Sequence, residues 1–302
     1  MTRRAQIVRA LSYVFLCVSS LIMIWPVLYA FLGAFTTGER LSEAVLLPIP
    51  DTLNLRFFTR IFNQGGDQPF NTPVMRAYLF TLARCAFYVT LSVVVGLLGG
   101  YVFSKLRFPG RNKLFLLFLA GMVMPGIVMI LPMFLMMARF PNAGGNNLFG
   151  QGGHGLIGDL RILFVFGWVP PLAIFLLKQA FDMVPNEYED AAKIDGAGFL
   201  TVLYRIYWPL LKPPVVALII ITFLMMWNDY LWPSLTISDT GDFMPITLLL
   251  KGAVASNFGG ADGGPSPFSL IGVLLALWPP ALVYFLLQRY FVQGMVASGL
   301  KG

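Results

Sequence analysis

Long apolar stretches dominate the pattern of hydrophobic and polar positions along the chain. A helix needs about 20 mostly apolar residues to cross about 30 Å of hydrocarbon. Six stretches contain no Asp, Glu, Lys or Arg: residues 10–38, 85–104, 114–138, 162–177, 213–228 and 263–288. Four of them reach that length alone, and the other two reach it with their flanks. The pattern predicts six transmembrane helices, at about residues 11–34, 81–104, 114–138, 157–181, 214–235 and 268–290.

The first apolar stretch has two interpretations, because Arg3, Arg4 and Arg9 precede it as basic residues precede a signal peptide. The apolar core of a signal peptide is about 7–15 residues long. This stretch continues to Phe35. We therefore expect an uncleaved first transmembrane helix.

Basic residues predict the orientation, because cytoplasmic segments of membrane proteins carry an excess of Lys and Arg. With a cytoplasmic N-terminus, the segments on that side hold 13 of the 21 Lys and Arg and five of the 14 acidic residues. Their net charge is +8, and that of the remaining chain is −1. We predict that both termini are cytoplasmic. The overall charge of +7 follows from this topology, so nucleic acid is not expected as a partner.

Composition agrees with a membrane protein. Of the 302 residues, 57% are hydrophobic and 12% are charged, whereas soluble domains have roughly 25% charged residues. These values exclude a water-soluble enzyme and a disordered chain. One histidine and two cysteines are too few for a Cys/His metal site or a disulfide framework, so no metal is expected. The predicted class is an all-α integral membrane protein.

Three segments are expected to face outward, at residues 35–80, 139–156 and 236–267. They are rich in turn-forming residues and too short to be domains with their own cores. Such loops commonly contact partners, and solvated linkers are an equally good interpretation.

The cytoplasmic segment 182–213 has a helix–turn–helix pattern. A proline and several acidic residues open the first helix, where the helix dipole favours anions. Asp195 and Gly196 signal a turn, and a second helix is expected at about 199–207, ending at Pro209. The apolar positions of both helices form a face to be covered. The acidic first half suits a lipid surface poorly, so a protein partner is favoured.

Residues 190–197 read Asp-Ala-Ala-Lys-Ile-Asp-Gly-Ala, and Leu203, Ile206, Pro209 and Pro213 follow them. This pattern closely resembles the EAA loop of the membrane permeases of binding-protein-dependent ABC importers. The usual loop begins Glu-Ala-Ala-x-x-Asp-Gly-Ala. The chain departs from it at the first position, where Glu is usual, and at Leu203, where Phe is common. Both substitutions keep the charge or the apolarity.

Other segments are similar to the sugar-importer branch of these permeases. They are Ser104–Arg111, Met124-Pro-Gly126 with Leu131-Pro132, Trp227-Asn-Asp229 and the end from Gln288 to Gly302. The resemblance covers about residues 76–302. It implies a type I ABC importer permease with three parts: a transmembrane helix and external loop at 1–75, the transmembrane domain at 76–290 with a coupling loop at 185–213, and a cytoplasmic tail at 291–302.

In this family the loop docks as a coupling helix on a cytoplasmic ATPase. By resemblance, the contact residues are Glu189, Asp190, Ala191, Ala192, Asp195, Gly196, Ala197, Ile206 and Pro209. The acidic side chains would meet basic groups of the ATPase. Gly196 would supply the turn.

The chain contains no Gly-x-x-x-x-Gly-Lys-Ser/Thr phosphate-binding loop, so we expect neither ATPase activity nor a bound cofactor in this chain. ATP and Mg would bind to a separate ATPase dimer. The resemblance also implies a second permease subunit in a heterodimer and an extracytoplasmic solute-binding protein. The expected location is a bacterial or archaeal cytoplasmic membrane, where the multi-pass chain contacts lipid.

Four residues near the outer end of the fifth predicted span are candidates for the translocation path: Trp227, Asn228, Asp229 and Tyr230. An ionisable residue at membrane depth is by default a functional hypothesis, and aromatic rings beside polar groups can stack on sugars. The alternative is an interfacial aromatic belt with a solvated Asp229. Arg84 and Arg161 are expected to extend to the outer interface.

The predicted function is import of a sugar, a di- or oligosaccharide, by the permease subunit of an ATP-driven importer. One alternative is a permease for another polar solute, such as glycerol phosphate. A secondary transporter and a membrane-embedded enzyme are disfavoured, because the predicted spans contain no His and almost no acidic residue.

Overall fold

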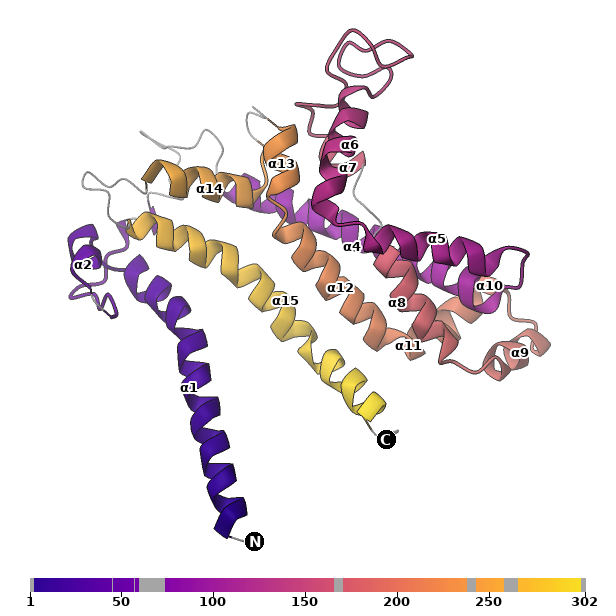
Figure 1. Ribbon diagram of the computed structural model, residues 1–302, viewed down its shortest axis with the longest axis horizontal. Helices are drawn as coiled ribbons and strands as arrows, with labels where there is room; N and C mark the ends of the chain where they lie inside the picture. The colour runs from indigo at the N-terminus through magenta and orange to yellow at the C-terminus, as the bar shows by residue number, and fades with distance from the viewer. Residues whose placement is uncertain are drawn as a thin grey trace. The chain divides into compact units, whose positions relative to one another are not determined.

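A computed structural model describes residues 3–44, 46–56, 58–59, 74–165, 171–237, 243–257 and 266–299 (Figure 1). Its helices are α1 (Arg3–Ala34), α2 (Gly38–Glu43), α4 (Val74–Lys105), α5 (Arg111–Val123), α6 (Gly126–Ala138), α7 (Ile162–Val165), α8 (Pro171–Asp182), α9 (Glu187–Ile194), α10 (Phe199–Thr201), the π-helix η1 (Val202–Tyr207), α11 (Trp208–Leu210), α12 (Lys212–Trp227), α13 (Leu231–Thr236), α14 (Ile246–Asn257) and α15 (Pro267–Gly299). These residues contain no β-strand, which confirms the all-helical class.

Four helical stretches in the described part of the chain are long and apolar enough to cross a membrane: Gln6–Ala34, Val74–Lys105, Lys212–Thr236 and Ser269–Arg289. Helices α5 and α6 make a fifth span if they are counted together. The fourth predicted span, 157–181, contains only the short helices α7 and α8, and residues 166–170 between them lie outside the described part. The count of six spans and the cytoplasmic position of the termini stay predictions.

The third predicted span is not one straight helix. Helices α5 and α6 meet at an angle of 99°. Met124 between them is extended, with φ −71° and ψ 121°, and Pro125 is the N-cap of α6. A proline disfavours helical geometry in the residue before it and cannot donate a backbone hydrogen bond. The helix predicted at 114–138 is therefore broken at Pro125.

The chain forms two compact units, residues 1–75 with 249–279 and residues 76–248 with 280–302. The three parts predicted from the sequence, with boundaries after residues 75 and 290, stay predictions. In the second unit α4 packs closely on α8. A Cβ atom on Gly100 would lie 2.9 Å from the backbone nitrogen of Lys178, and one on Gly96 would lie 3.1 Å from the carbonyl oxygen of Ala173. Small residues let the two backbones touch, as in many membrane helix pairs.

An ion pair joins α4 to the break between α12 and α13. The Arg84 Nη2 atom lies 2.5 Å from Asp229 Oδ2, and the side chains are 3% and 18% exposed. Arg84 Nε and the Tyr88 hydroxyl both donate to the carbonyl of Leu163, at 3.3 and 2.7 Å. Arg84 thus points into the protein rather than to the outer interface, because Asp229 compensates its buried charge. Arg161 is exposed and pairs with Asp159 at 2.6 Å.

Replacing Arg84 alone is expected to destabilise the protein, because it leaves the Asp229 carboxylate buried without its partner. Arg84→Met should lower the free energy of unfolding by about 3–5 kcal/mol. Arg84→Met with Asp229→Asn should regain most of that loss, because no unpaired charge remains. The thermal unfolding midpoint of the purified protein measures both effects. A single variant as stable as the wild type would show that the pair does not hold the two helices.

Candidate functional site

The predicted coupling loop contains the eight-residue helix α9, whose ends follow from its sequence. The N–H groups of Glu189 and Asp190 donate to the carbonyl of Asn186, at 2.9 and 3.0 Å. Three acidic residues occupy the first turn, where the helix dipole stabilises negative charge: Glu187, Glu189 and Asp190. The short helix is therefore stabilised locally before any tertiary contact.

The turn after α9 depends on a glycine. Gly196 has a φ of +80°, and its N–H donates to the carbonyl of Lys193 at 3.0 Å. The Ala197 N–H donates to the carbonyl of Ala192 at 2.9 Å. These two bonds form a Schellman motif, which ends a helix with a left-handed residue. Nothing lies within 4 Å of a Cβ atom built on Gly196, so backbone conformation rather than space requires glycine here.

The segment after the turn differs from its expected form. The second helix does not end at Pro209, because α10, η1 and α11 follow one another without a break from Phe199 to Leu210. In a regular α-helix the Pro209 ring would clash with the carbonyl four residues earlier. The wider turn of η1 avoids this clash, and the Trp208 N–H donates to the carbonyl of Leu203, five residues back.

Glu189 is turned into the protein, although it is one of the predicted partner-contact residues. It is 5% exposed. The Tyr101 hydroxyl donates to Glu189 Oε1 at 2.7 Å, and the Tyr207 hydroxyl donates to Oε2 at 2.5 Å. The Lys193 ammonium lies 2.7 Å from Oε1. Both carboxylate oxygens are therefore occupied within the chain.

This network also sets the ionisation of Glu189. Burial raises the pKa of the carboxyl, but hydrogen bonds from Lys193, Tyr207 and Tyr101 outweigh it, and the pKa is lowered from its ordinary value. Burial and the bond to Glu189 raise the pKa of Tyr207. Glu189 thus stays charged at neutral pH. Its contribution to stability is present above the ordinary carboxyl pKa and is lost as the pH falls through the lowered value.

Polar bonds from the inner end of α4 hold the segment before α9. The Lys105 ammonium donates to the carbonyl of Val184 at 2.6 Å and to Asn186 Oδ1 at 2.8 Å. The Ser104 hydroxyl donates to Asp182 Oδ1 at 2.6 Å. The predicted coupling loop is therefore tied at its start to a long apolar helix.

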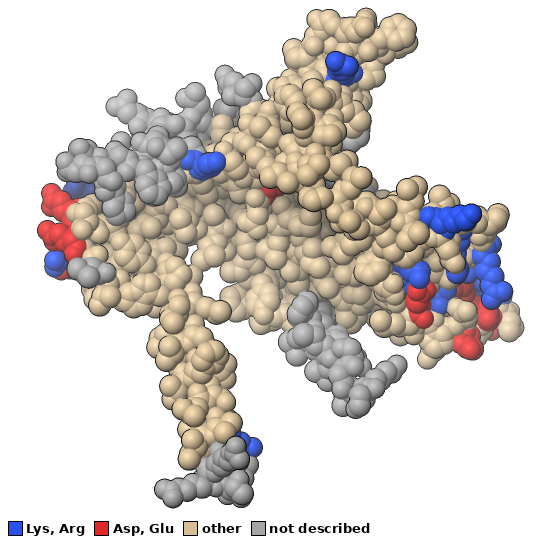
Figure 2. All heavy atoms as spheres, viewed as in Figure 1, with Lys and Arg blue, Asp and Glu red and all other residues tan. Residues whose placement is uncertain are grey.

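The other predicted contact residues lie nearer to the surface. Asp190, Ala191, Asp195, Gly196 and Pro209 are exposed, and Ala192, Ala197 and Ile206 are partly buried. Large apolar side chains lie beside them, and Ile194 and Leu200 are 87% and 73% exposed. Met183, Tyr188 and Tyr204 are exposed as well. In Figure 2, charged side chains gather at the end of the second unit that carries α9.

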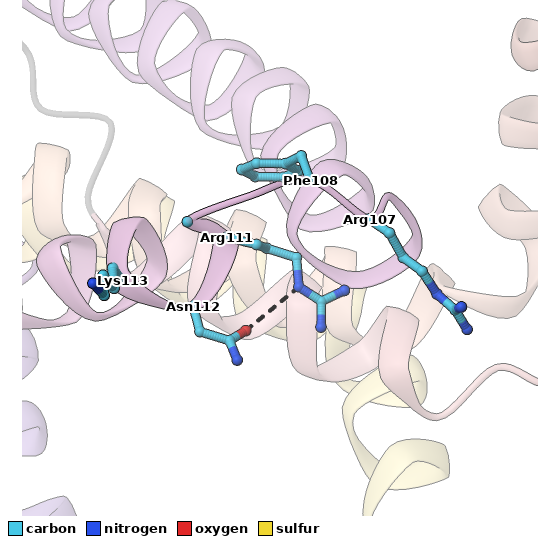
Figure 3. A pocket seen from close by; sticks show the side chains of 6 residues that line it. Arg107, Phe108, Arg111, Asn112 and Lys113 are labelled. Carbon is cyan, nitrogen blue, oxygen red and sulfur yellow. Dashed lines mark hydrogen bonds between the residues drawn. The ribbon is translucent and has the colours of Figure 1, made fainter.

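The short basic turn between α4 and α5 borders a shallow hollow of about 420 Å³. Its charged side chains are Arg107, Arg111 and Lys113. In Figure 3 these side chains point in different directions, and Arg111 lies next to Asn112. Arg111 also donates to the carbonyls of Ser104 and Leu106, at 3.4 and 3.2 Å. The turn is thus braced by its own backbone, in line with a basic cytoplasmic segment.

The four predicted path residues lie at the interruption between α12 and α13, but they differ in their surroundings. Trp227 is buried and stacks on Phe223, with ring centroids 5.8 Å apart. Asn228 is exposed, and Tyr230 is partly buried. Asp229 pairs with Arg84 and is not a solvated carboxylate. Their role in a path stays a prediction. Among the residues with described side chains, no group of His, Cys, Asp and Glu could hold a metal ion.

Sequence reasoning found the loop and its turn, but it missed Tyr101 and Arg84 as partners of the site. Tyr101 lies 88 residues before Glu189, and Arg84 lies 145 residues before Asp229. The sequence did offer a signal for Arg84, which is a charged residue inside the span predicted at 81–104. No local pattern marks Tyr101, because its hydroxyl acquires a role only through the packing of α4.

Comparison with known proteins agrees with this geometry. The chain is 29% identical to the maltodextrin transport system permease protein MdxG of Bacillus subtilis over 291 residues, covering 96% of this chain and 95% of MdxG. It is 28% identical to the sn-glycerol-3-phosphate transport system permease protein UgpE of Yersinia pestis over 293 residues, covering 95% of each. It is also 28% identical to the inner membrane ABC transporter permease protein YcjP of Escherichia coli, covering 97% of this chain and 98% of YcjP.

The fold matches a chain in the crystal structure of a bacterial ABC transporter involved in import of the acidic polysaccharide alginate. The TM-score is 0.74 at 22% identity, covering 96% of this chain and 99% of that chain. Residues 92–297 match the family described as binding-protein-dependent transport system inner membrane component. This chain therefore belongs to that family, as a multi-pass permease subunit of an ABC importer in the cytoplasmic membrane.

Proposed function

We propose that this permease imports a di- or oligosaccharide and that α9 with the following segment to Pro209 couples it to a separate ATPase dimer. The observation that carries this proposal is the arrangement of the loop. The side of the loop that faces the protein is hydrogen-bonded to α4 through Glu189. The side that faces solvent exposes Asp190, Ile194 and Leu200. A surface with large exposed apolar side chains beside acidic ones suits a protein partner that has an apolar groove and basic groups.

The chain carries one such loop, which supports a heterodimer with a second permease subunit, so that each copy of the ATPase dimer meets one loop. ATP and Mg would be bound by the ATPase, and this chain would bind no cofactor. An extracytoplasmic solute-binding protein would deliver the substrate to the outer face. The predicted outer segment 236–267, which includes α14, is rich in glycine and is our candidate for that contact.

A sugar is favoured as substrate over glycerol phosphate by the chemistry near the predicted path. Arg84, which contacts the path residue Asp229, is already neutralised by it and is not available to compensate a phosphate. The relative MdxG is named for maltodextrin transport and the relative UgpE for sn-glycerol-3-phosphate transport, with nearly equal identity to this chain. Glycerol phosphate is therefore kept as the second candidate.

The turn at Gly196 gives a test of the coupling role. Gly196→Val should leave the protein in the membrane at normal abundance but largely abolish ATP-driven uptake, because a β-branched residue at a φ of +80° is strained. Gly196→Asn should retain much of the uptake, because asparagine tolerates the left-handed region better. Uptake per copy of permease is the measurement. Normal uptake by the valine variant would contradict a coupling role for this turn.

The proposed contact is tested by reconstituting the permease pair with its ATPase and binding protein. Asp190→Lys should reduce co-purification of the ATPase by about tenfold, because the reversed charge would oppose a basic groove. Glu187→Lys is the matched control, since it makes the same charge change in the same helical turn at an exposed position outside the predicted contact.

Equal effects of the two variants would assign the loss to the helix dipole instead of the contact. Full retention of the ATPase by Asp190→Lys would contradict the contact itself.

The substrate is tested in the same reconstituted system. Uptake of labelled maltodextrin that is competed by sugars and not by glycerol 3-phosphate would support a sugar as the substrate. The reverse pattern would establish the second candidate.

A further inference from the structure

Adjacent acidic residues in α9 have opposite surroundings. Asp190 is exposed to solvent, whereas Glu189 is 5% exposed. Two tyrosine hydroxyls and one ammonium group occupy the Glu189 carboxylate, at distances of 2.5–2.7 Å. A carboxylate whose two oxygens are already hydrogen-bonded has little left to offer a basic group of another protein. These two neighbouring acids therefore cannot have the same role.

The Glu189 network connects three elements of the second unit. Tyr101 belongs to the last two turns of α4, Glu189 to α9 and Tyr207 to η1. The rings around the carboxylate also pack on one another. The centroids of Tyr101 and Tyr207 are 6.0 Å apart, and Phe181 lies 4.9 Å from Tyr207. The aromatic rings keep water away, and the hydroxyl groups stabilise the charge that water would otherwise solvate.

We propose that Glu189 is a positioning residue that fixes α9 to α4 through Tyr101 and Tyr207, and that it makes no contact with the ATPase. This inference rests on the proposed coupling function of the loop and divides it between two neighbours. Asp190 and the exposed apolar residues bind the partner. Glu189 makes the bound helix move together with a transmembrane helix of 32 residues. Without this bond, the loop would still be joined to α4 through the bonds of Lys105 and Ser104 to the segment before α9, but ATPase motion would displace α4 less.

The two tyrosines allow the proposal to be tested without changing the partner-binding surface. Tyr101→Phe and Tyr207→Phe keep both rings and remove one hydroxyl each, and both side chains are buried. Each variant leaves a buried carboxylate with one hydrogen bond fewer. We expect normal co-purification of the ATPase, together with a several-fold rise in the ATP hydrolysed per substrate molecule transported. Glu189→Gln should give the same pattern.

Two exposed acids of the same turn are the matched controls. Glu187→Gln should change neither ATPase binding nor the ATP used per substrate. Asp190→Asn should weaken ATPase binding instead. The double variant Tyr101→Phe with Glu189→Gln should be little worse than either single variant, because both changes break one interaction. The proposal is overturned if Glu189→Gln weakens ATPase binding as Asp190→Asn does, or if both Phe variants keep the wild-type ratio of ATP to substrate.

A measurement on the permease without ATPase separates this inference from the proposed function. Loss of one hydrogen bond to a charged group should speed amide hydrogen exchange in α9 about tenfold in Tyr101→Phe and Tyr207→Phe. Glu187→Gln should leave the exchange unchanged. Unchanged exchange in both Phe variants would overturn the positioning role, whatever the partner of the loop is. Faster exchange without any ATPase binding by the wild type would refute the proposed coupling and leave the positioning contact standing.

Discussion

The buried charge of Glu189 is the interaction on which the end of the second unit that carries α9 depends. A carboxylate can be withdrawn from water only where hydrogen bonds replace its hydration. Tyr101 and Tyr207 provide two of them, so α4, α9 and η1 must keep one arrangement around the carboxylate. Lys105 adds bonds to the segment before α9. An eight-residue helix, too short to be stable alone, thereby becomes a rigid part of the permease.

The same principle operates at the other end of α4. Arg84 is withdrawn from water because Asp229 and the carbonyl of Leu163 compensate its charge. Helix α4 therefore bears one compensated charge near its outer end and the partners of a second at its inner end. Between these two places α4 packs its glycines directly against α8. One long helix thus connects the predicted coupling loop to the interruption between α12 and α13.

Local sequence signals predicted the features that are local in origin. The Schellman turn at Gly196 follows from one glycine after a short helix, and the long apolar helices follow from composition. Prolines were harder to interpret, because their effect depends on the space around them. Pro125 breaks the helix predicted at 114–138, whereas Pro209 lies within a helical segment that was expected to end there. The π-helical turn η1 lets Pro209 continue the helix, and no residue type marks such a turn in a sequence.

Charged residues show the same limit of sequence reasoning. Glu189 and Asp190 are equivalent in a sequence, and only the position of Tyr101 distinguishes the buried acid from the exposed one. Arg84 was expected to extend to the outer interface, because the sequence does not reveal a partner that lies 145 residues away. Such pairs form only when distant helices pack, so pattern and spacing within one segment do not reveal them.

The coupling function proposed for this permease requires the exposed side of α9 to meet the ATPase. Photocrosslinking from a photoreactive amino acid at position 194 tests it most directly, because Ile194 is 87% exposed and lies at the end of α9. Position 148 in the predicted outer segment, where Leu148 is also exposed, is the control. We expect a crosslink to the ATPase from position 194 and none from position 148. An actively transporting complex that gives no ATPase crosslink from position 194 would contradict that coupling function.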